Sequence, residues 1–487
     1  MGLMRSKIIF WIFLFLIFGA MAYGSFFAYK IYSTGKKVNI SANDPSSFVQ
    51  TLKSFSNDTP IDLRGAQKKR INVLLLGMAG KGKPGQYLTD TIMIASIDLE
   101  NNRVALLSIP RDLYVEIPSA GIQTKINSVY QYGRNASEKD ENEASGMMKK
   151  TITEITGLEM HYFLILNFDG FEKAINDIGG INIMNEQDIY DARYPGPNYS
   201  YETFELSKGF HKLDGATALK YARQRHGDPE GDFGRAKRQQ QIMQATKSKI
   251  FSAGTMFDVF ALNKLLDTLG ENIRTDISTS EFADFFELTK KLDTQNITSV
   301  VIDAWNRDSL LKVSHVQYGP VRAFVLVPRI GNYSEIRELA ENIFDRNKIE
   351  RKKEELAKEN AYIAIINRSG NLQVAGKIKN VLQENLSYKN VFILTENNKN
   401  VSAKTIAYDL TDGQKPFTLD ELAGKLPATV SYAAPDDIKK VIRDKTVDII
   451  LVIGKDLISK YNIEEGTIED LNNYNDLQEQ NLFIKNP

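Results

Sequence analysis

The first strong pattern along the chain is an apolar run without charges over residues 8–29. As an α-helix this run would measure about 33 Å, enough to cross a hydrocarbon layer of about 30 Å. Arg5 and Lys7 precede it and Lys30 follows it, so the flanking charges do not decide its orientation. We predict a cytoplasmic tip and a single-pass anchor over residues 1–30, with the rest of the chain outside the cytoplasm.

A cleaved signal peptide is the alternative, because Ala20-Met21-Ala22 matches a small-x-small cleavage site. The apolar run continues past that site, which favours an uncleaved anchor. Residues 31–69 are polar and weakly patterned, and we expect them to form a stalk.

Strand and helix patterns alternate between residues 70 and 333. Strand patterns occur at residues 71–76, 91–97, 103–109, 162–166, 298–302 and 323–327. Helical patterns occur at residues 146–155, 171–178, 214–222, 235–252, 263–270 and 280–291. This alternation predicts an α/β or α+β core with an extension at its C-terminal end.

A charged helical stretch, a second small domain and a tail complete the chain. Residues 334–360 are rich in Lys and Glu, and we expect a solvated linker helix. Residues 361–456 again alternate between strand and helix patterns, which predicts a small α/β domain. Residues 457–487 are rich in Asn and Glu and are typical of a flexible tail.

The composition of the chain excludes several classes of functional site. The chain has 61 Lys and Arg against 61 Asp and Glu, which argues against a general nucleic-acid binder with a basic excess. It has no cysteine, which excludes disulfides, cysteine-ligated metals and a thiol nucleophile. Its 4 histidines are far apart in sequence, so a histidine-rich metal site is not expected.

One motif imitates a nucleotide-binding loop. The segment from Gly77 to Lys83 follows a strand pattern and has the spacing GxxxxGK. Position 84 is proline, so the hydroxyl that would hold Mg²⁺ is missing and the required helix is disfavoured. We therefore interpret the segment as a flexible loop and not as an NTPase site.

A second set of polar residues lies where predicted strands and helices begin or end. The set comprises Asp90, Arg111, Lys125, Arg223, Arg225, Arg235 and Gln239. Arg235 and Gln239 would share a helix face, and Arg223 and Arg225 would point to one side of an extended segment. Each guanidinium offers a charged fork that matches phosphate oxygens. The set predicts a pyrophosphate or phosphate-ester site, whereas surface ion pairs with neighbouring acids are an equally good account of the spacing.

Several motifs in one order resemble the LytR-CpsA-Psr family. They are Thr89-Asp90-Thr91, Ser108-Ile109-Pro110-Arg111-Asp112, Lys125-Ile126-Asn127, Asn167-Phe168-Asp169, Ile178-Gly179-Gly180, Leu213-Asp214-Gly215, Ala222-Arg223-Gln224-Arg225 and Arg235-Ala236-Lys237-Arg238-Gln239. The resemblance covers about residues 70–250 and extends more loosely to about residue 330. Residues 361–456 resemble the LytR C-terminal domain that often follows.

The resemblance implies a mixed central sheet flanked by helices and a membrane-anchored phosphotransferase. Such an enzyme moves a glycopolymer from a polyprenyl-pyrophosphate carrier to a hydroxyl of peptidoglycan or protein, with pyrophosphatase activity as a side reaction. Carried over by position, Arg111, Arg223, Arg225 and Arg235 would bind pyrophosphate, assisted by Lys125 and Gln239. Asp90 would hold Mg²⁺ or activate the acceptor.

The chain departs from the family pattern at Ala79, where many members have an aspartate that helps to hold the metal, and at Leu88, where many have an arginine. Asp98 and Asp112 are candidate replacements. Phe163, Leu164, Phe168 and Phe171 are candidates for the lipid groove, although ordinary core packing is the simpler account of each. A non-catalytic envelope scaffold that binds the lipid-linked or anionic polymer is the second functional hypothesis.

Overall fold

The computed structural model describes residues 63–458, except residues 251–271 and short stretches at 119, 138, 197–199, 226, 229, within 279–290, 305–308, 319–320, 397–399, 427 and 443–444. The predicted anchor, most of the predicted stalk, nearly all of the predicted tail and the predicted helix at residues 263–270 lie outside the described residues. Within the part of the chain that the structure describes, no helix is long and apolar enough to cross a membrane.

The described residues form two compact units, each built from several segments of the chain. The first unit contains the described residues up to Leu106 together with Gly133–Ser145 and Met160–Ser299. The second unit contains Leu107–Tyr132, Gly146–Glu159 and the described residues from Val300 onward. The domain boundaries expected from the sequence stay a prediction.

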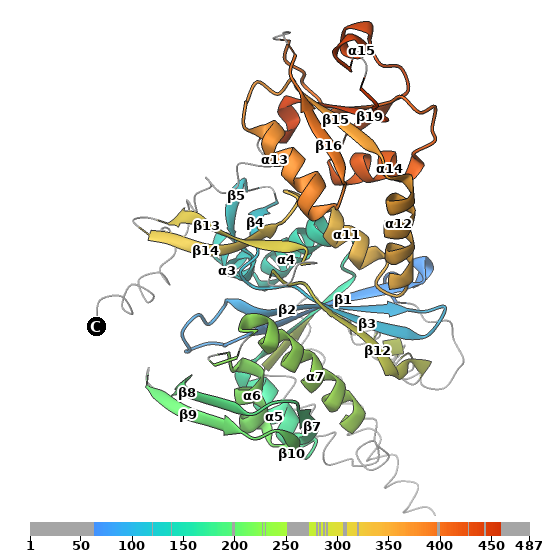
Figure 1. Cartoon of the computed structure of the whole chain (residues 1–487). Helices are drawn as coiled ribbons and strands as arrows, with labels where there is room; N and C mark the ends of the chain where they lie inside the picture. Colours follow the sequence, from blue (N-terminus) through green and yellow to red (C-terminus); the bar gives the residue numbers. More distant parts are fainter. Residues whose placement is uncertain are drawn as a thin grey trace, which may run out of the picture. The chain divides into compact units, whose positions relative to one another are not determined.

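A six-stranded mixed sheet confirms the predicted α/β class. Its strands are β1 (Arg70–Met78), β2 (Thr89–Asp98), β3 (Arg103–Ser108), β6 (Tyr162–Asn167), β11 (Ile273–Thr275) and β12 (Asp293–Val301), in the order β11-β6-β1-β2-β3-β12. β1 pairs antiparallel with β2 and parallel with β6 (Figure 1). Ile71, Leu74 and Ile94 are fully buried, as their apolar runs predicted.

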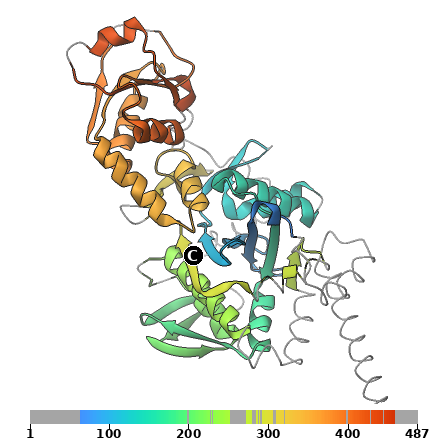
Figure 2. The same ribbon diagram turned by 90° about the vertical axis from the view of Figure 1, so that its right-hand side faces the viewer.

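Two ribbons and three helices carry the polar motifs of the first unit. The ribbons pair β7 (Ile181–Asn185) with β10 (Gly209–Leu213), and β8 (Ile189–Pro195) with β9 (Tyr201–Leu206). The helices are α5 (Phe168–Asp177), α6 (Gly215–Arg223) and α7 (Asp232–Ile250), and α7 packs along α6 and β7 (Figure 2). Asn167 and Asp214 cap the N-termini of α5 and α6. A Cβ at Gly215 would lie 2.0 Å from the carbonyl oxygen of Glu172, so this helix contact requires glycine.

The second unit begins with short strands that the sequence did not predict. They are β4 (Tyr114–Ile117), β5 (Ile122–Lys125), β13 (Leu311–Tyr318) and the first residues of β14 (Val321–Pro328). A 3-10 turn (η2, Ile126–Ser128) follows β5, and helices α3 (Val129–Ala136) and α4 (Glu141–Thr156) have residues in both units. Val316, Val325 and Val327 pack on Tyr114, so the β13–β14 hairpin has one buried face.

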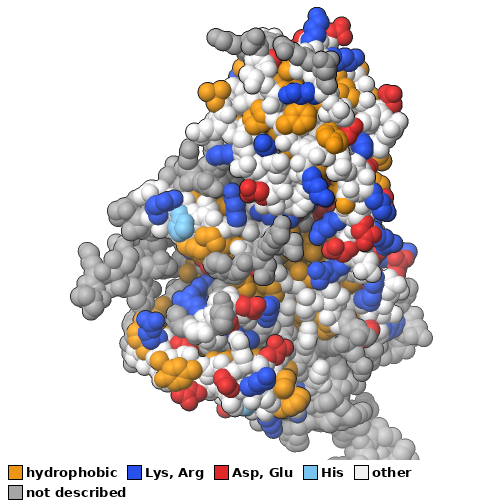
Figure 3. Space-filling view, in the orientation of Figure 1, with side chains coloured by type: hydrophobic (Ala, Val, Ile, Leu, Met, Phe, Trp, Pro, Cys, Tyr) orange, Lys and Arg blue, Asp and Glu red, His pale blue; other side chains and the backbone are white. Residues whose placement is uncertain are grey.

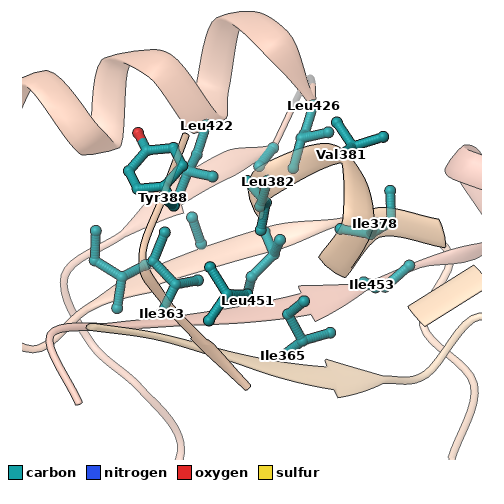
Figure 4. Packing of buried hydrophobic residues seen from close by; sticks show 14 of the residues in the cluster. Ile363, Ile365, Ile378, Val381, Leu382, Tyr388, Leu422, Leu426, Leu451 and Ile453 are labelled. Atoms are coloured by element: carbon teal, nitrogen blue, oxygen red, sulfur yellow. The ribbon is translucent and has the colours of Figure 1, made fainter. Parts of the chain in front are cut away.

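The C-terminal part of the second unit contains a five-stranded sheet in the order β16-β15-β19-β17-β18. Its strands are β15 (Tyr362–Asn367), β16 (Asn390–Leu394), β17 (Ile406–Asp409), β18 (Thr429–Ser431) and β19 (Ile449–Ile453). Its helices are α13 (Val374–Asn380), a π-helical turn (η4, Val381–Asn385), α14 (Pro416–Lys425) and α15 (Asp436–Ile442). Figure 4 shows Ile363, Ile365 and Leu451 of the sheet beneath Ile378 and Leu382. Ile366 and Ile450 pack in a second cluster, so both faces of the sheet are buried and these strand patterns are apolar throughout.

Residues 334–360, expected to form a solvated linker helix, contain two helices, and none of the residues in the second helix is buried. Two helices, α11 (Ser334–Glu341) and α12 (Arg346–Glu359), occupy this stretch. The Lys352 Nζ lies 3.2 Å from Glu338, 3.0 Å from Asp420 and 2.9 Å from Glu421. Burial opposes the charge of Lys352, but these carboxylates outweigh it and raise the lysine pKa. One face of α12 therefore contacts α11 and α14 through half-buried side chains such as Lys352.

Candidate functional site

The GxxxxGK segment is a loop between two strands. β1 ends at Met78 and β2 begins at Thr89, so no helix starts behind Lys83. The Lys83 Nζ instead lies 2.6 Å from Asp169 Oδ1. A phosphate cradle needs a helix N-terminus at this point, and the structure therefore agrees with the interpretation of this segment as a loop.

Asp90 is the extra residue of a β-bulge at the start of β2. Gly77 pairs with Thr91 while the next residue, Met78, pairs with Thr89, and the register shifts between them. A bulge re-aims side chains that would otherwise alternate between the two faces of a sheet. The Nη2 of Arg235 donates to the Asp90 carbonyl oxygen over 3.0 Å. The fold thus brings Asp90 and Arg235, two predicted site residues, together.

Arg223 and Arg225 do not occupy one extended segment, because Arg223 is the last residue of α6. Its guanidinium carbon lies 4.5 Å from the ring centre of Phe168 and 5.5 Å from that of Tyr194. Burial raises the pKa of Tyr194 to about 12 although the Arg223 charge opposes the shift, so the phenol stays neutral at physiological pH. Arg225 follows the helix and is exposed.

The i,i+4 pair on α7 is confirmed, and Gln239 has a defined contact. Its Nε2 donates to the Ala222 carbonyl oxygen over 3.2 Å, which fastens α7 to the last turn of α6. Arg235 lies on the same helix and is buried. The contact of Gln239 with Ala222 and that of Arg235 with Asp90 set the position of α7 relative to the end of α6 and to the bulge in β2.

Arg238 belongs to the interior and not to the predicted anion site. Its guanidinium pairs with Asp228 and donates to the carbonyl oxygens of Tyr221 and Gln224. The neighbouring Lys237 pairs with Glu230 at the surface. Lys237 and Arg238 therefore form ion pairs with neighbouring acids, as the alternative interpretation of the basic cluster predicted.

Arg111 and Lys125 come together in the second unit around Asp112. The Lys125 Nζ lies 2.7 Å from Asp112 Oδ1, and the Arg111 Nε lies 3.6 Å from Asp112 Oδ2. The backbone holds this group in place, since Leu326 N–H donates to the Asp112 carbonyl oxygen over 2.9 Å. Sequence analysis named Asp112 only as a candidate metal ligand. Its position directly after Arg111 in the sequence was the one sign that Asp112 could form an ion pair with the basic residues.

The seven predicted residues are divided between the two units, and the contact that joins two of them in the first unit is that of Arg235 with Asp90. Asp90, Arg223, Arg225, Arg235 and Gln239 lie in the first unit, and Arg111 and Lys125 lie in the second. Each set places guanidinium or ammonium side chains beside the end of a strand or helix. Such donors stabilise the oxygens of a phosphate through charge-assisted hydrogen bonds.

Two of the lipid-groove candidates have ordinary structural roles. Phe163 is buried in β6 within the central sheet. Phe171 packs against the core of α5, α6 and the ribbons. Leu164 is half-buried, and Phe168 lies under the Arg223 guanidinium.

Metal ligation has limited support among the described residues. They contain no group of three or more His, Asp or Glu side chains that could hold a metal ion. Ala79, at the position where the family pattern has aspartate, is buried. Asp112 is already engaged by Lys125 and Arg111, which makes it a poor replacement.

Asp98 is not a replacement either, because it lies at the opposite end of β2 from Asp90. Its carboxylate accepts hydrogen bonds from Asn101 Nδ2 over 2.8 Å and from Arg103 Nη2 over 2.7 Å. Burial favours the neutral acid, but these donors outweigh it and lower the pKa of Asp98. Asp98 therefore fixes the turn between β2 and β3.

Asp98→Asn is expected to lower the free energy of unfolding by about 1 to 2 kcal/mol at pH 7. The partial exposure of Arg103 keeps this effect small. Because the pKa of Asp98 is lower in the folded state, its contribution is present above the unfolded pKa and is lost as pH falls through the folded value. Urea unfolding should show the difference at pH 7 and little difference at about pH 2. A difference that persists in acid would contradict this role.

Comparisons with known proteins agree with the motifs. The model of the LytR_cpsA_psr family matches residues 25–319. Regulatory protein MsrR of Staphylococcus aureus is 35% identical over 240 residues, which are 48% of this chain and 66% of that protein. Polyisoprenyl-teichoic acid–peptidoglycan teichoic acid transferase TagU of Bacillus anthracis is 27% identical over 283 residues, which are 58% of this chain and 82% of that protein.

Among solved structures, B. subtilis TagV aligns with a TM-score of 0.43 at 25% identity and covers 57% of this chain and 98% of that chain. The family assignment does not depend on this alignment. The family model spans more than half of the 487 residues. The chain therefore belongs to the LytR-CpsA-Psr family.

Proposed function

We propose that this chain is a glycopolymer transferase of the cell envelope. It would move a glycopolymer from a polyprenyl-pyrophosphate carrier to a hydroxyl of the cell wall. The observation that carries the proposal is the grouping of basic side chains at the family-motif positions: Arg235 at the Asp90 bulge, and Arg111 with Lys125 around Asp112. The name of the TagU relative, a teichoic acid transferase acting on peptidoglycan, supports this substrate class.

The proposed step is one phosphoryl transfer. The acceptor hydroxyl oxygen attacks the phosphorus that carries the glycan, and a new P–O bond forms. The bond from that phosphorus to the bridging oxygen breaks, and polyprenyl phosphate leaves with the electron pair. The hydroxyl proton passes to a base, for which Asp90 is our candidate. Catalysis of this kind depends on positioning and on neutralising charge, which suits a site built from arginines.

In the alternative arrangement Asp90 is the protein ligand of Mg²⁺, and the hydroxyl proton then passes to the solvent. Mg²⁺ is commonly bound through one or two carboxylates plus substrate phosphates, so a single aspartate fits when the donor completes the set. The ion would neutralise charge on the pyrophosphate. By their motif positions, our candidates for binding pyrophosphate oxygens are Arg223, Arg225 and Arg235, with Gln239 assisting, in the first unit and Arg111 and Lys125 in the second. An anchor formed by residues 8–29 would keep the pyrophosphate-binding residues at the extracytoplasmic surface of the cell membrane, where the lipid donor would be located.

Turnover by the full-length protein in detergent tests the proposal. With a polyprenyl-pyrophosphate glycan donor and Mg²⁺, we expect release of polyprenyl phosphate. Asp90→Asn should lower the rate about tenfold to a hundredfold, because it removes a charge at the reacting phosphate. The exposed Asp436→Asn is the matched control and should keep the parental rate. Tight binding of the donor without turnover, with or without Mg²⁺, would instead support the scaffold hypothesis.

A further inference from the structure

One face of the β13–β14 hairpin of the second unit is partly exposed, because its buried positions lie at the end that contains Leu326 and its other described positions are exposed or half-buried. Register pairs His315 with Phe324 and Gln317 with Arg322, so these side chains lie on one face together with Val313. Val316 and Val325 lie on the opposite, buried face. His315, Gln317 and Arg322 are exposed, and Phe324 is half-buried. We call Val313, His315, Gln317, Arg322 and Phe324 the hairpin face.

The hairpin face adjoins the group of Arg111, Asp112 and Lys125. The Lys125 Nζ lies 6.0 Å from the ring centre of Phe324, and the His315 ring centre lies 6.1 Å from the same ring in an edge-on arrangement. The backbone of β14 is joined to this group by the hydrogen bond from Leu326 to Asp112. The order Lys125, Phe324, His315 thus leads from the proposed phosphate site onto the hairpin.

The charge of the hairpin favours an anionic ligand. Between Leu311 and Pro328 the sequence contains Lys312, His315 and Arg322 but no aspartate or glutamate. The space-filling view shows basic and hydrophobic side chains next to each other in the region of this hairpin (Figure 3). A ligand that alternates negative charges with apolar C–H surface would complement both features.

Part of the hairpin face lies outside the residues that the family model matches. The family model ends at residue 319, before Arg322 and Phe324.

We propose that the hairpin face binds the sugar–phosphate units of the glycopolymer next to the transferred phosphate. The face of an aromatic ring is electron-rich and attracts the C–H edge of a sugar ring, which assigns Phe324 to stacking. Arg322 would bind the next phosphodiester as a charged fork, and His315 would donate to it or to a hydroxyl. This subsite rests on the proposed function, because it places the polymer by reference to Arg111 and Lys125.

Binding of a lipid-free polymer in which sugar rings alternate with phosphodiesters tests the subsite without turnover. The full-length protein in detergent should bind this polymer more tightly than neutral dextran, and added salt should weaken the binding. Phe324→Ala and Arg322→Gln should each raise Kd about fivefold to tenfold. Phe417→Ala removes another partly exposed phenylalanine of the second unit and should leave Kd unchanged.

Thermal unfolding of each variant guards against misfolding, and Arg322→Gln changes only an exposed side chain. Unchanged Kd in both folded variants would overturn the subsite even if the enzyme is active. Polymer binding that depends on Phe324 and Arg322 in a protein without turnover would support the subsite and contradict the proposed function. Loss of binding to phosphatidylglycerol vesicles with unchanged polymer binding would show a membrane-contact surface and overturn the proposal.

Discussion

Replacement of Arg111 by alanine should slow glycopolymer transfer by about a hundredfold to a thousandfold. Arg111 lies beside Asp112 and Lys125, in a group that we assign to the pyrophosphate. Its guanidinium would stabilise charge that moves to the leaving phosphate, and this stabilisation is greatest in the transition state. The change should therefore appear in kcat, measured as polyprenyl phosphate released by the full-length protein.

Two further variants make this prediction specific. Arg111→Lys keeps the positive charge but loses the bidentate fork, and it should have an intermediate rate. Arg351→Ala removes an exposed arginine of α12 and should keep the parental rate. If Arg111→Ala is folded and transfers glycopolymer at the parental rate, Arg111 does not belong to the site.

Arg238→Ala should destabilise the protein by about 3 to 5 kcal/mol. The side chains of Arg238 and Asp228 are 9% and 2% exposed, so the substitution leaves a buried carboxylate without its cation. The carbonyl oxygens of Tyr221 and Gln224 also lose their donor at the end of α6. We expect a lower midpoint in urea and a loss of activity that follows the loss of folded protein.

The adjacent Lys237→Ala is a suitable control, because it removes the same charge from an exposed ion pair with Glu230. This variant should cost less than about 1 kcal/mol. Equal destabilisation by the two substitutions would show that the Arg238 contacts contribute little. A stable but inactive Arg238→Ala variant would instead show that Arg238 belongs to the functional site.

Local patterns were sufficient for much of the fold. Residues 71–76 and 162–166 predicted β1 and β6, because continuous apolar runs are typical of strands buried on both faces. The starts of α5 and α6 depend on Asn167 and Asp214, which bond backbone groups three residues away. β13 was not predicted, because the alternation of apolar and polar residues breaks at Ser314, a buried polar position, and its buried face is small.

The sequence by itself determined the α/β class, the motif positions and the family resemblance, since each depends on residue type and short spacing. Only the tertiary structure decided which basic residues gather at a proposed site. Arg235 and Arg238 are three positions apart, yet one bonds Asp90 in β2 and the other bonds Asp228 and the end of α6. Lys125 reaches Asp112 through the β4–β5 hairpin. The partners of these long side chains lie on segments that are distant in sequence, and residue spacing alone does not predict which segments come together.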